Sequence, residues 1–172
     1  NQTSLMTYTI NVAPTITTVL VSPTSPITYG TSSNFSCSNT GNLPMTLYIN
    51  GIDSTSELGL NITRGAGNYS LNCTSYGNSN YTGSIALSNY TINKAVPILY
   101  SVVTSPITYG TASNYSANES NSGDGDLVYT LQINGVNLIN GSAVSDSSVL
   151  GAGNYTYNYS TFGGENYTSA EK

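Results

Sequence analysis

The residues of this chain best suited to chemistry are asparagines in Asn-x-Ser/Thr triplets, the acceptor motif for N-linked glycans. The sequence of 172 residues holds thirteen such triplets, although its 22 Asn and 49 Ser or Thr residues would give only about 6 by chance. In ten of them the middle residue is Tyr, Phe, Ile or Cys. The triplets begin at Asn1, Asn34, Asn61, Asn68, Asn72, Asn80, Asn89, Asn114, Asn118, Asn140, Asn154, Asn158 and Asn166.

The apolar middle residue of these triplets is typical of a strand. Residues i and i+2 of a β-strand share one face, and residue i+1 lies on the other. In Asn158-Tyr159-Ser160, for example, Tyr159 would point into a core while the acceptor asparagine faces solvent, where a glycan can attach. We expect most of the thirteen sites to carry glycans in an archaeal or eukaryotic host. Plain polar alternation of half-buried strands is the alternative explanation.

Catalytic or metal chemistry has little support in the sequence. The chain has no His, which excludes a histidine base, a histidine-dependent triad and imidazole metal ligands. Asp124 and Asp126, in a Gly-Asp-Gly-Asp run, are candidates for Ca²⁺, but two carboxylates are few for its oxygen shell, and a solvated turn is favoured. We therefore predict no enzyme activity, no metal site and no cofactor besides N-linked glycans. The other carboxylates are scattered: Asp53, Glu57, Glu119, Asp146, Glu165 and Glu171.

Composition and charge point to an all-β protein without a nucleic-acid or anionic-membrane partner. The net charge is −5 with only three basic residues, which argues against nucleic acid and anionic membrane as partners. No apolar run reaches the roughly 20 residues of a membrane span. Tyr, Val, Ile and Thr favour strands, and no sustained helical period occurs. The chain starts at Asn1 rather than Met, which indicates a processed or internal start.

An internal repeat organises the chain. The motif at residues 25–31, Ser-Pro-Ile-Thr-Tyr-Gly-Thr, recurs at 105–111, and Gly-Ala-Gly-Asn-Tyr at 65–69 recurs at 151–155. Ile-Asn-Gly and Asn-Tyr-Thr are also repeated, and the offset grows from 80 to 86 because the second repeat carries small insertions. One insertion, at residues 122–126, is predicted to be a loop.

Each repeat reads as short strands separated by turn signals, the pattern of a β-sandwich. An Asn-Gly pair follows one strand in each repeat and predicts a type I′ hairpin, because both of its central residues need a positive φ. The predicted strands span residues 16–21, 33–38, 47–50, 68–75 and 85–93 in the first repeat, and 98–103, 113–118, 127–134 and 154–162 in the second.

The repeated turn and core motifs resemble the bacterial and archaeal immunoglobulin-like repeats of large surface proteins. The resemblance rests on Pro-Ile-Thr-Tyr-Gly-Thr, on Gly-Ala-Gly-Asn-Tyr and on the Tyr-Gly-Asn-Ser-Asn-Tyr that follows, and it covers nearly the whole chain. These motifs specify a fold better than a function. The resemblance implies two tandem immunoglobulin-like β-sandwiches and a rod-like, multi-repeat cell-surface or filament protein.

In such domains a disulfide commonly joins the two sheets. Cys37 lies on the second predicted strand and Cys73 on the strand after the Gly-Ala-Gly turn, the strands that face each other in that fold. We expect a bridge, worth about 3–4 kcal/mol for a loop of roughly 36 residues; two buried free thiols are the alternative. The second repeat has Ala117 and Tyr159 instead, a small residue facing a large one, which suggests an unbridged core of similar volume.

The two ends of the sequence fit together. Lys172 aligns with Ala86, so the second repeat stops before its last strand, while residues 5–11 match residues 87–93. We expect residues 5–12 to complete the second repeat of an adjacent 172-residue unit, either a separate subunit or the next period of a longer polypeptide. An arbitrary sequence boundary is the alternative. The residues expected to donate this strand are Leu5, Met6, Tyr8, Ile10 and Val12.

These observations predict three segments: a donated strand at residues 1–13, an immunoglobulin-like repeat at 14–95 and a second repeat at 96–172. The predicted function is structural. The chain would be a unit of a glycosylated extracellular filament, stalk or surface array, with copies of itself as head-to-tail partners. A cell-surface adhesin or carbohydrate-binding module is the second hypothesis, and a cluster of three or more exposed tyrosines at one end of a domain would favour it.

Overall fold

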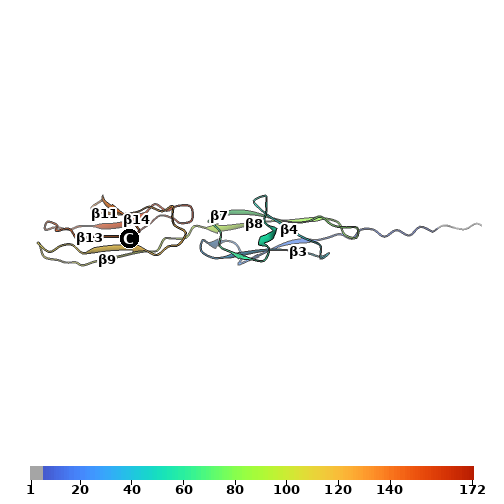
Figure 1. Cartoon of the computed structure of the whole chain (residues 1–172), viewed down its shortest axis with the longest axis horizontal. Coiled ribbons are helices and arrows are strands. Elements are labelled where there is room, and N and C mark those ends of the chain that lie inside the picture. The colour runs from blue at the N-terminus through green and yellow to red at the C-terminus, as the bar shows by residue number, and fades with distance from the viewer. Residues whose placement is uncertain (1–5) are drawn as a thin grey trace, which may run out of the picture. The chain divides into compact units, whose positions relative to one another are not determined.

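The computed structural model describes residues 6–172, which form β-strands and one short 3₁₀ helix, η1 (Figure 1). The predicted all-β class is confirmed. No helix in this part of the chain is long or apolar enough to cross a membrane. The elements are β1 (Thr17–Ser22), β2 (Ile27–Thr28), β3 (Ser33–Asn39), β4 (Thr46–Ile49), β5 (Ile52–Asp53), η1 (Thr55–Glu57), β6 (Asn61–Ile62), β7 (Gly67–Ser75), β8 (Ser84–Asn93), β9 (Leu99–Val103), β10 (Tyr115–Glu119), β11 (Tyr129–Ile133), β12 (Val136–Asn140), β13 (Ala143–Asp146), β14 (Tyr157–Thr161) and β15 (Ala170–Glu171).

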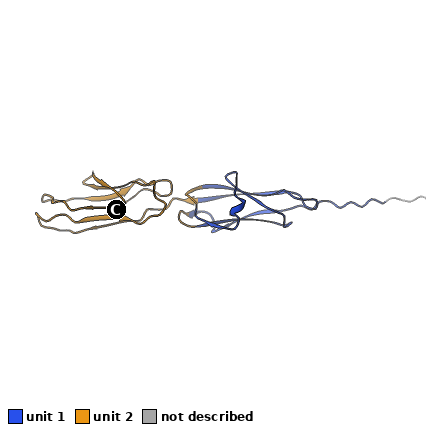
Figure 2. Ribbon diagram, viewed as in Figure 1, with its two compact units in different colours: residues 1–27, 32–63, 68–91 blue, residues 28–31, 64–67, 92–172 orange. Residues whose placement is uncertain are grey.

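The chain divides into two compact units (Figure 2). Unit 1 takes the described residues through Ile27 together with Ser32–Thr63 and Asn68–Thr91. Unit 2 takes Ile92–Lys172 and also two short loops, Thr28–Thr31 and Arg64–Gly67, that belong to the first repeat by sequence. The chain passes from unit 1 to unit 2 between Thr91 and Ile92, four residues before the predicted boundary between residues 95 and 96.

Unit 1 contains two sheets of mainly antiparallel strands. The strands of each sheet come from distant parts of the sequence. The smaller sheet has the order β1-β3-β6 and the larger has the order β2-β8-β7-β4-β5. The alternation of β3 buries Phe35, and that of β7 buries Leu71 and Cys73. Two sheets with apolar faces turned toward a shared core are consistent with a β-sandwich.

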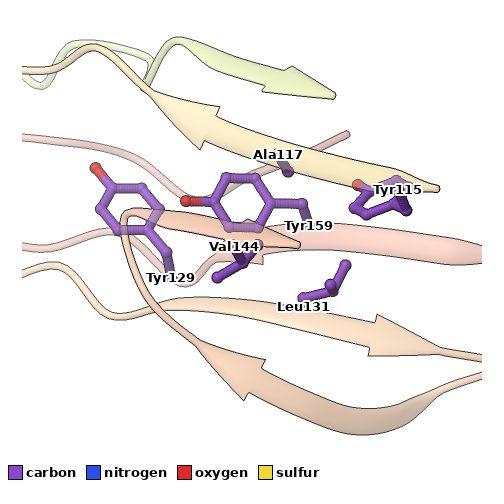
Figure 3. Packing of buried hydrophobic residues seen from close by; sticks show 6 residues of the cluster. All are labelled: Tyr115, Ala117, Tyr129, Leu131, Val144 and Tyr159. Carbon is purple, nitrogen blue, oxygen red and sulfur yellow. The ribbon is translucent and has the colours of Figure 1, made fainter. Parts of the chain in front are cut away.

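Unit 2 follows the same plan. Its sheets have the orders β13-β10-β9 and β12-β11-β14-β15. A cluster of buried side chains from both sheets forms the core, and Figure 3 shows it from close by. Its six members are Tyr115 and Ala117 on β10, Tyr129 and Leu131 on β11, Val144 on β13 and Tyr159 on β14.

The predicted Asn-Gly hairpins are present in both units. Asn50 and Gly51 have φ of +50° and +80° between β4 and β5, and Asn134 and Gly135 have φ of +49° and +80° between β11 and β12. Asn and Gly are the residues that tolerate this left-handed backbone most readily, so they set where each hairpin turns. The strands after these turns, β5 and β12, were not among the predicted ones.

A disulfide joins Cys37 on β3 to Cys73 on β7, with 5.8 Å between their Cα atoms. It therefore links the two sheets of unit 1, as expected. At the matching positions of unit 2, Ala117 and Tyr159 are both buried, and the Tyr159 hydroxyl donates to the carbonyl oxygens of Gly141 and Ser142 at 2.9 and 3.0 Å. A large side chain with satisfied polar atoms takes the place of the bridge there.

Removing the disulfide should destabilise unit 1 selectively. We expect the Cys37→Ala/Cys73→Ala variant to lose about 2–4 kcal/mol of unfolding free energy in unit 1, because its unfolded state is no longer constrained. Unit 2 has no cysteine and should be unaffected. Urea unfolding with hydrogen exchange resolved by peptide measures the two units separately. Reductant should reproduce the loss in the wild-type chain and change nothing further in the variant; an equal loss in unit 2 would contradict this assignment.

Candidate assembly site

The strand β8 completes the larger sheet of unit 1 and fills part of its core. It lies between β2 and β7, and its inward residues Tyr90 and Ile92 are 0% and 2% exposed. The Tyr90 ring meets Phe35 edge-on with 4.9 Å between ring centroids, and its hydroxyl donates to the carbonyl oxygen of Pro23 at 2.9 Å. β8 thus supplies both hydrogen bonds to its neighbours and apolar side chains to the core.

Within residues 6–172, the equivalent strand of unit 2 is the two-residue β15. β15 pairs with the last two residues of β14, and the backbones of Lys172 and Tyr159 exchange two further hydrogen bonds, of 2.9 and 3.0 Å. Within the described chain, Tyr157 and Asn158 of β14 pair with β11 alone. β14 has five residues where β7 has nine, and residues 153–156, which match the start of β7, lie outside any strand.

The side chains around this position are exposed in unit 2 and covered in unit 1. Ile27 on β2 is 7% exposed, whereas its counterpart Ile107 is 41% exposed and lies outside any strand. Tyr155 is exposed, whereas its counterpart Tyr69 is half-buried. We call residues 107–109 and 153–158 the open edge of unit 2.

The predicted donor residues within the described chain lie outside any strand. Residues 6–12 form no strand and pair with no other strand of the described chain. Tyr8 and Ile10 are 89% and 82% exposed, although they match Tyr90 and Ile92 of β8, which are buried. Met6 and Val12 are exposed as well, and the predicted donor residue Leu5 lies outside the described residues.

A buried carboxylate ties the two sheets of unit 2 together beside the open edge. Asp146, at the end of β13, accepts hydrogen bonds from the hydroxyls of Tyr157 at 2.5 Å, Ser148 at 2.5 Å and Ser113 at 3.0 Å. Burial opposes its ionisation, but these donors outweigh burial and lower the pKa of Asp146. The charge is therefore stable in a buried site without a basic partner.

Two tyrosines stack next to this carboxylate. The rings of Tyr115 and Tyr157 are nearly parallel, at 7°, with centroids 4.4 Å apart. Burial, and then the bond to Asp146, raise the pKa of Tyr157, so its hydroxyl stays protonated as a donor. The sequence analysis missed this network. Its only signal was that the second repeat has Asp146 and Tyr157 where the first has Leu60 and Leu71.

The acceptor triplets on strands have the expected geometry. The central residues Phe35, Cys73, Tyr90, Tyr115 and Tyr159 are buried or nearly so, while the asparagines before them are half-buried or exposed. Asparagines 68, 154, 61, 80, 118 and 140 are also exposed, 166 is half-buried, and Asn1 lies outside the described residues. On these strands the pleat therefore places the asparagine and the central residue of each triplet on opposite faces.

The two loop carboxylates have separate protein partners. Asp124 accepts a hydrogen bond from the Tyr129 hydroxyl at 2.6 Å, and Asp126 accepts one from the backbone N–H of Glu165 at 2.5 Å. No group of three or more His, Cys, Asp or Glu that could hold a metal ion occurs among residues 6–172. Residues 122–126 lie in turns and bends, as predicted for a loop.

A shallow depression lies on the larger sheet of unit 1. Tyr48 lines it beside Asn72, Leu87 and Asn89. The Tyr48 hydroxyl lies 3.0 Å from that of the exposed Tyr76. Two tyrosines near a concave surface are fewer than the three that would favour a sugar-binding platform, and two acceptor asparagines occupy the same surface.

Comparison with known proteins does not assign the chain to a family. No protein-family profile matches it, and no curated protein does. One solved structure that aligns with it is the apo structure of Bacteroides uniformis β-glucuronidase 3, at 11% identity over 91% of this chain and 24% of that chain. The TM-score of that alignment is 0.31, too low to support any argument about fold or activity.

Acid should destabilise unit 2 through Asp146. Because its folded pKa lies below its ordinary value, the carboxylate contributes fully to stability above about pH 4. That contribution is lost as the pH falls through the folded pKa. We expect Asp146→Asn to lower the unfolding free energy of unit 2 at pH 7 by about 1–3 kcal/mol, because buried donors lose a charged acceptor, and to flatten its decline below about pH 4.

Urea unfolding at several pH values, read by hydrogen exchange of peptides from unit 2, measures both effects. Glu165→Gln removes one carboxylate elsewhere on unit 2 and serves as the control for net charge. An Asp146→Asn variant with the wild-type pH dependence would rule out this role.

Proposed function

We propose that this chain is a structural unit of a glycosylated extracellular filament, stalk or surface array, in which copies join head to tail by strand complementation. The observation that carries the proposal is the open edge of unit 2 and the exposed segment 6–12, whose sequence matches the strand that covers the same position in unit 1. An unpaired strand edge beside exposed apolar side chains favours the addition of another strand.

The strand order supports an immunoglobulin-like fold for each unit. In unit 1 the sheets β1-β3-β6 and β2-β8-β7-β4-β5 follow the order of immunoglobulin strands A, B and E against A′, G, F, C and C′. The disulfide then joins strands B and F, its usual position in that fold. In these terms, the strand that unit 2 would receive is G.

Complementation has a sufficient apolar driving force. Tyr8 and Ile10 would take the places that Tyr90 and Ile92 occupy in unit 1, with Met6 and Val12 continuing the alternation. Burying four such side chains at about 1.5–3 kcal/mol each would contribute about 6–12 kcal/mol before the cost of ordering the segment. The added strand would also pair backbone groups of residues 153–158.

The direction of joining determines the assembly. A segment at one end of the sequence that seats on the other end of a second copy makes a heterologous contact, which leads to an open chain rather than a closed dimer. The donor is either a separate subunit or the following unit of the same polypeptide. Both forms place the same residues against the open edge.

Other features support an extracellular location. A cross-sheet disulfide is typical of oxidising compartments, and thirteen acceptor triplets suit a glycan-coated surface. Glycans would also account for solubility in a chain with only 6% charged residues. The second candidate, an adhesin or carbohydrate-binding module, rests on the Tyr48–Tyr76 surface of unit 1.

The strand proposal can be tested by competition. The full chain should self-associate in a concentration-dependent way, and a synthetic peptide of residues 1–13 in excess should shorten the assemblies, because it occupies the open edge. A peptide carrying Tyr8→Ala and Ile10→Ala should compete at least 100-fold less well, since it loses two buried side chains. Sedimentation velocity measures both. A full chain that stays monomeric at high concentration and binds no peptide would refute strand complementation.

Glycosylation can be tested on protein from its natural host. We expect glycopeptide mass spectrometry to find sugars on several of the strand sites, because their side chains face outward: Asn34, Asn68, Asn72, Asn114, Asn154 and Asn158. Asn121 and Asn134, which are not in acceptor triplets, are internal controls and should be bare. Unmodified asparagine at all six sites would mean that the triplets reflect polar alternation alone.

A further inference from the structure

Unit 2 includes two short loops that come from the first repeat in sequence, Thr28–Thr31 and Arg64–Gly67, and a small set of contacts joins them to the rest of the unit. The Tyr29 ring meets Tyr167 edge-on, at 78° with 5.4 Å between centroids. The backbone N–H of Ala66 donates to the side-chain oxygen of Asn166 at 2.9 Å. The N–H of Tyr29 also donates to the carbonyl oxygen of Asn93, the last residue of β8, at 2.9 Å. We call the contacts among Tyr29, Ala66, Asn166 and Tyr167 the loop contact.

The chain after β8 is bonded to the loop that carries Asn166 and Tyr167. Ala95 forms a parallel bridge with Tyr167. The N–H of Ala95 donates to the carbonyl oxygen of Asn166, and its carbonyl oxygen accepts from the N–H of Thr168, both at 2.9 Å. Backbone hydrogen bonds thus hold the chain just after β8 against the loop that carries Asn166 and Tyr167.

The second repeat supplies a second copy of the Tyr29 and Ala66 half of the loop contact. Tyr109 and Ala152 match Tyr29 and Ala66. The turn around each tyrosine is the same: Gly30 and Gly110 have φ of +94° and +92°, and the hydrogen bond that closes the turn is 3.1 Å in one and 3.0 Å in the other. Tyr109 is nevertheless 75% exposed, whereas Tyr29 is half-buried.

The first repeat supplies a second copy of the other half, which consists of Asn166 and Tyr167. Asn80 and Tyr81, in the loop of residues 77–82, match Asn166 and Tyr167. Ala13 forms a parallel bridge with Tyr81, with hydrogen bonds of 2.8 and 2.9 Å, as Ala95 does with Tyr167. Gly77 and Gly163 open the two loops with φ of +78° and +82°. Each half is therefore preformed, and Asn80 is exposed.

We propose that Tyr109 and Ala152 form a docking surface for the loop of residues 77–82 of a second copy of this chain. Tyr109 would meet Tyr81 edge-on, and the N–H of Ala152 would donate to the side-chain oxygen of Asn80. This inference rests on the strand complementation proposed above, and it adds a second contact to it. The fit lacks two hydrogen bonds. Lys94 Nζ donates to the carbonyl oxygen of Gly164 at 2.7 Å, and Val12, at the matching position, cannot donate. The Tyr29 hydroxyl donates to the carbonyl oxygen of Ser122 at 3.5 Å, in an insertion that the first repeat does not have.

Chain connectivity identifies the second copy as the occupant. Residues 5–12 lead directly into Ala13, which is already bonded to the loop of residues 77–82. In unit 2, the same short link from β8 to Ala95 carries the loop contact. A strand seated on the open edge would therefore bring the Tyr81 loop of its own copy to Tyr109.

The test compares self-association of full-length variants by sedimentation velocity. Tyr109→Ala and Asn80→Ala should each weaken association about 2- to 10-fold, the range for one aromatic pair or one hydrogen bond. The double variant should be weakened less than the product of the two, because both changes disrupt one contact. Phe162→Ala, another exposed aromatic, is the control and should associate like the wild type.

The peptide of residues 1–13 separates this inference from the strand proposal, since it lacks the loop of residues 77–82. Asn80 lies outside the open edge, so the peptide should bind the Asn80→Ala variant and the wild type equally. If the peptide binds and Asn80→Ala still associates like the wild type, or if the two variants combine multiplicatively, the docking surface is wrong while strand complementation stands. If the peptide binds neither chain, strand complementation fails and this inference fails with it.

Discussion

A β-strand is stabilised by hydrogen bonds to the strands beside it, and in unit 1 β8 lies beside both β2 and β7. Where unit 2 has the two-residue β15 within residues 6–172, the counterpart of β2 is not a strand and the counterpart of β7 is shorter. The affected residues are the ones next to the missing pairings, while the rest of β14 keeps its partner β11. The differences between the two units at this edge therefore follow the differences in strand pairing.

The two units hold their sheets together by different means. Unit 1 uses the covalent link between Cys37 and Cys73, and unit 2 uses a large tyrosine in the core together with the hydroxyl donors around Asp146. The polar solution depends on satisfying every group, because a buried carboxylate without donors is costly. It also depends on pH, which the disulfide does not. The same architecture is thus maintained with different sensitivities to reduction and to acid.

Much of the fold could be predicted from the sequence, because alternation and turn residues are local signals. The Asn-Gly pairs located two hairpins, and the period-two pattern placed the main strands within about three residues of their observed ends. Short edge strands such as β6 and β13 were missed because two to four residues carry too little pattern. The Asp146 network was missed for another reason: its donors Ser113, Ser148 and Tyr157 come together only through the tertiary fold. The grouping of residues 28–31 and 64–67 with unit 2 likewise depends on contacts distant in sequence.

The backbone bridge at Ala95 has a consequence for survival among proteases. An enzyme that cuts after basic residues has two internal targets in this chain, Arg64 and Lys94. Proteases draw a substrate into their cleft as a free, extended segment, so exposed linkers between repeats are usually nicked first. Here both backbone groups of Ala95 are hydrogen-bonded and the Lys94 amine is bound to a carbonyl oxygen, so the bond between these two residues must be released before it can be cleaved. The lifetime of this linker in a protease-rich environment is therefore set by how often the bridge opens, rather than by how much of the linker lies on the surface.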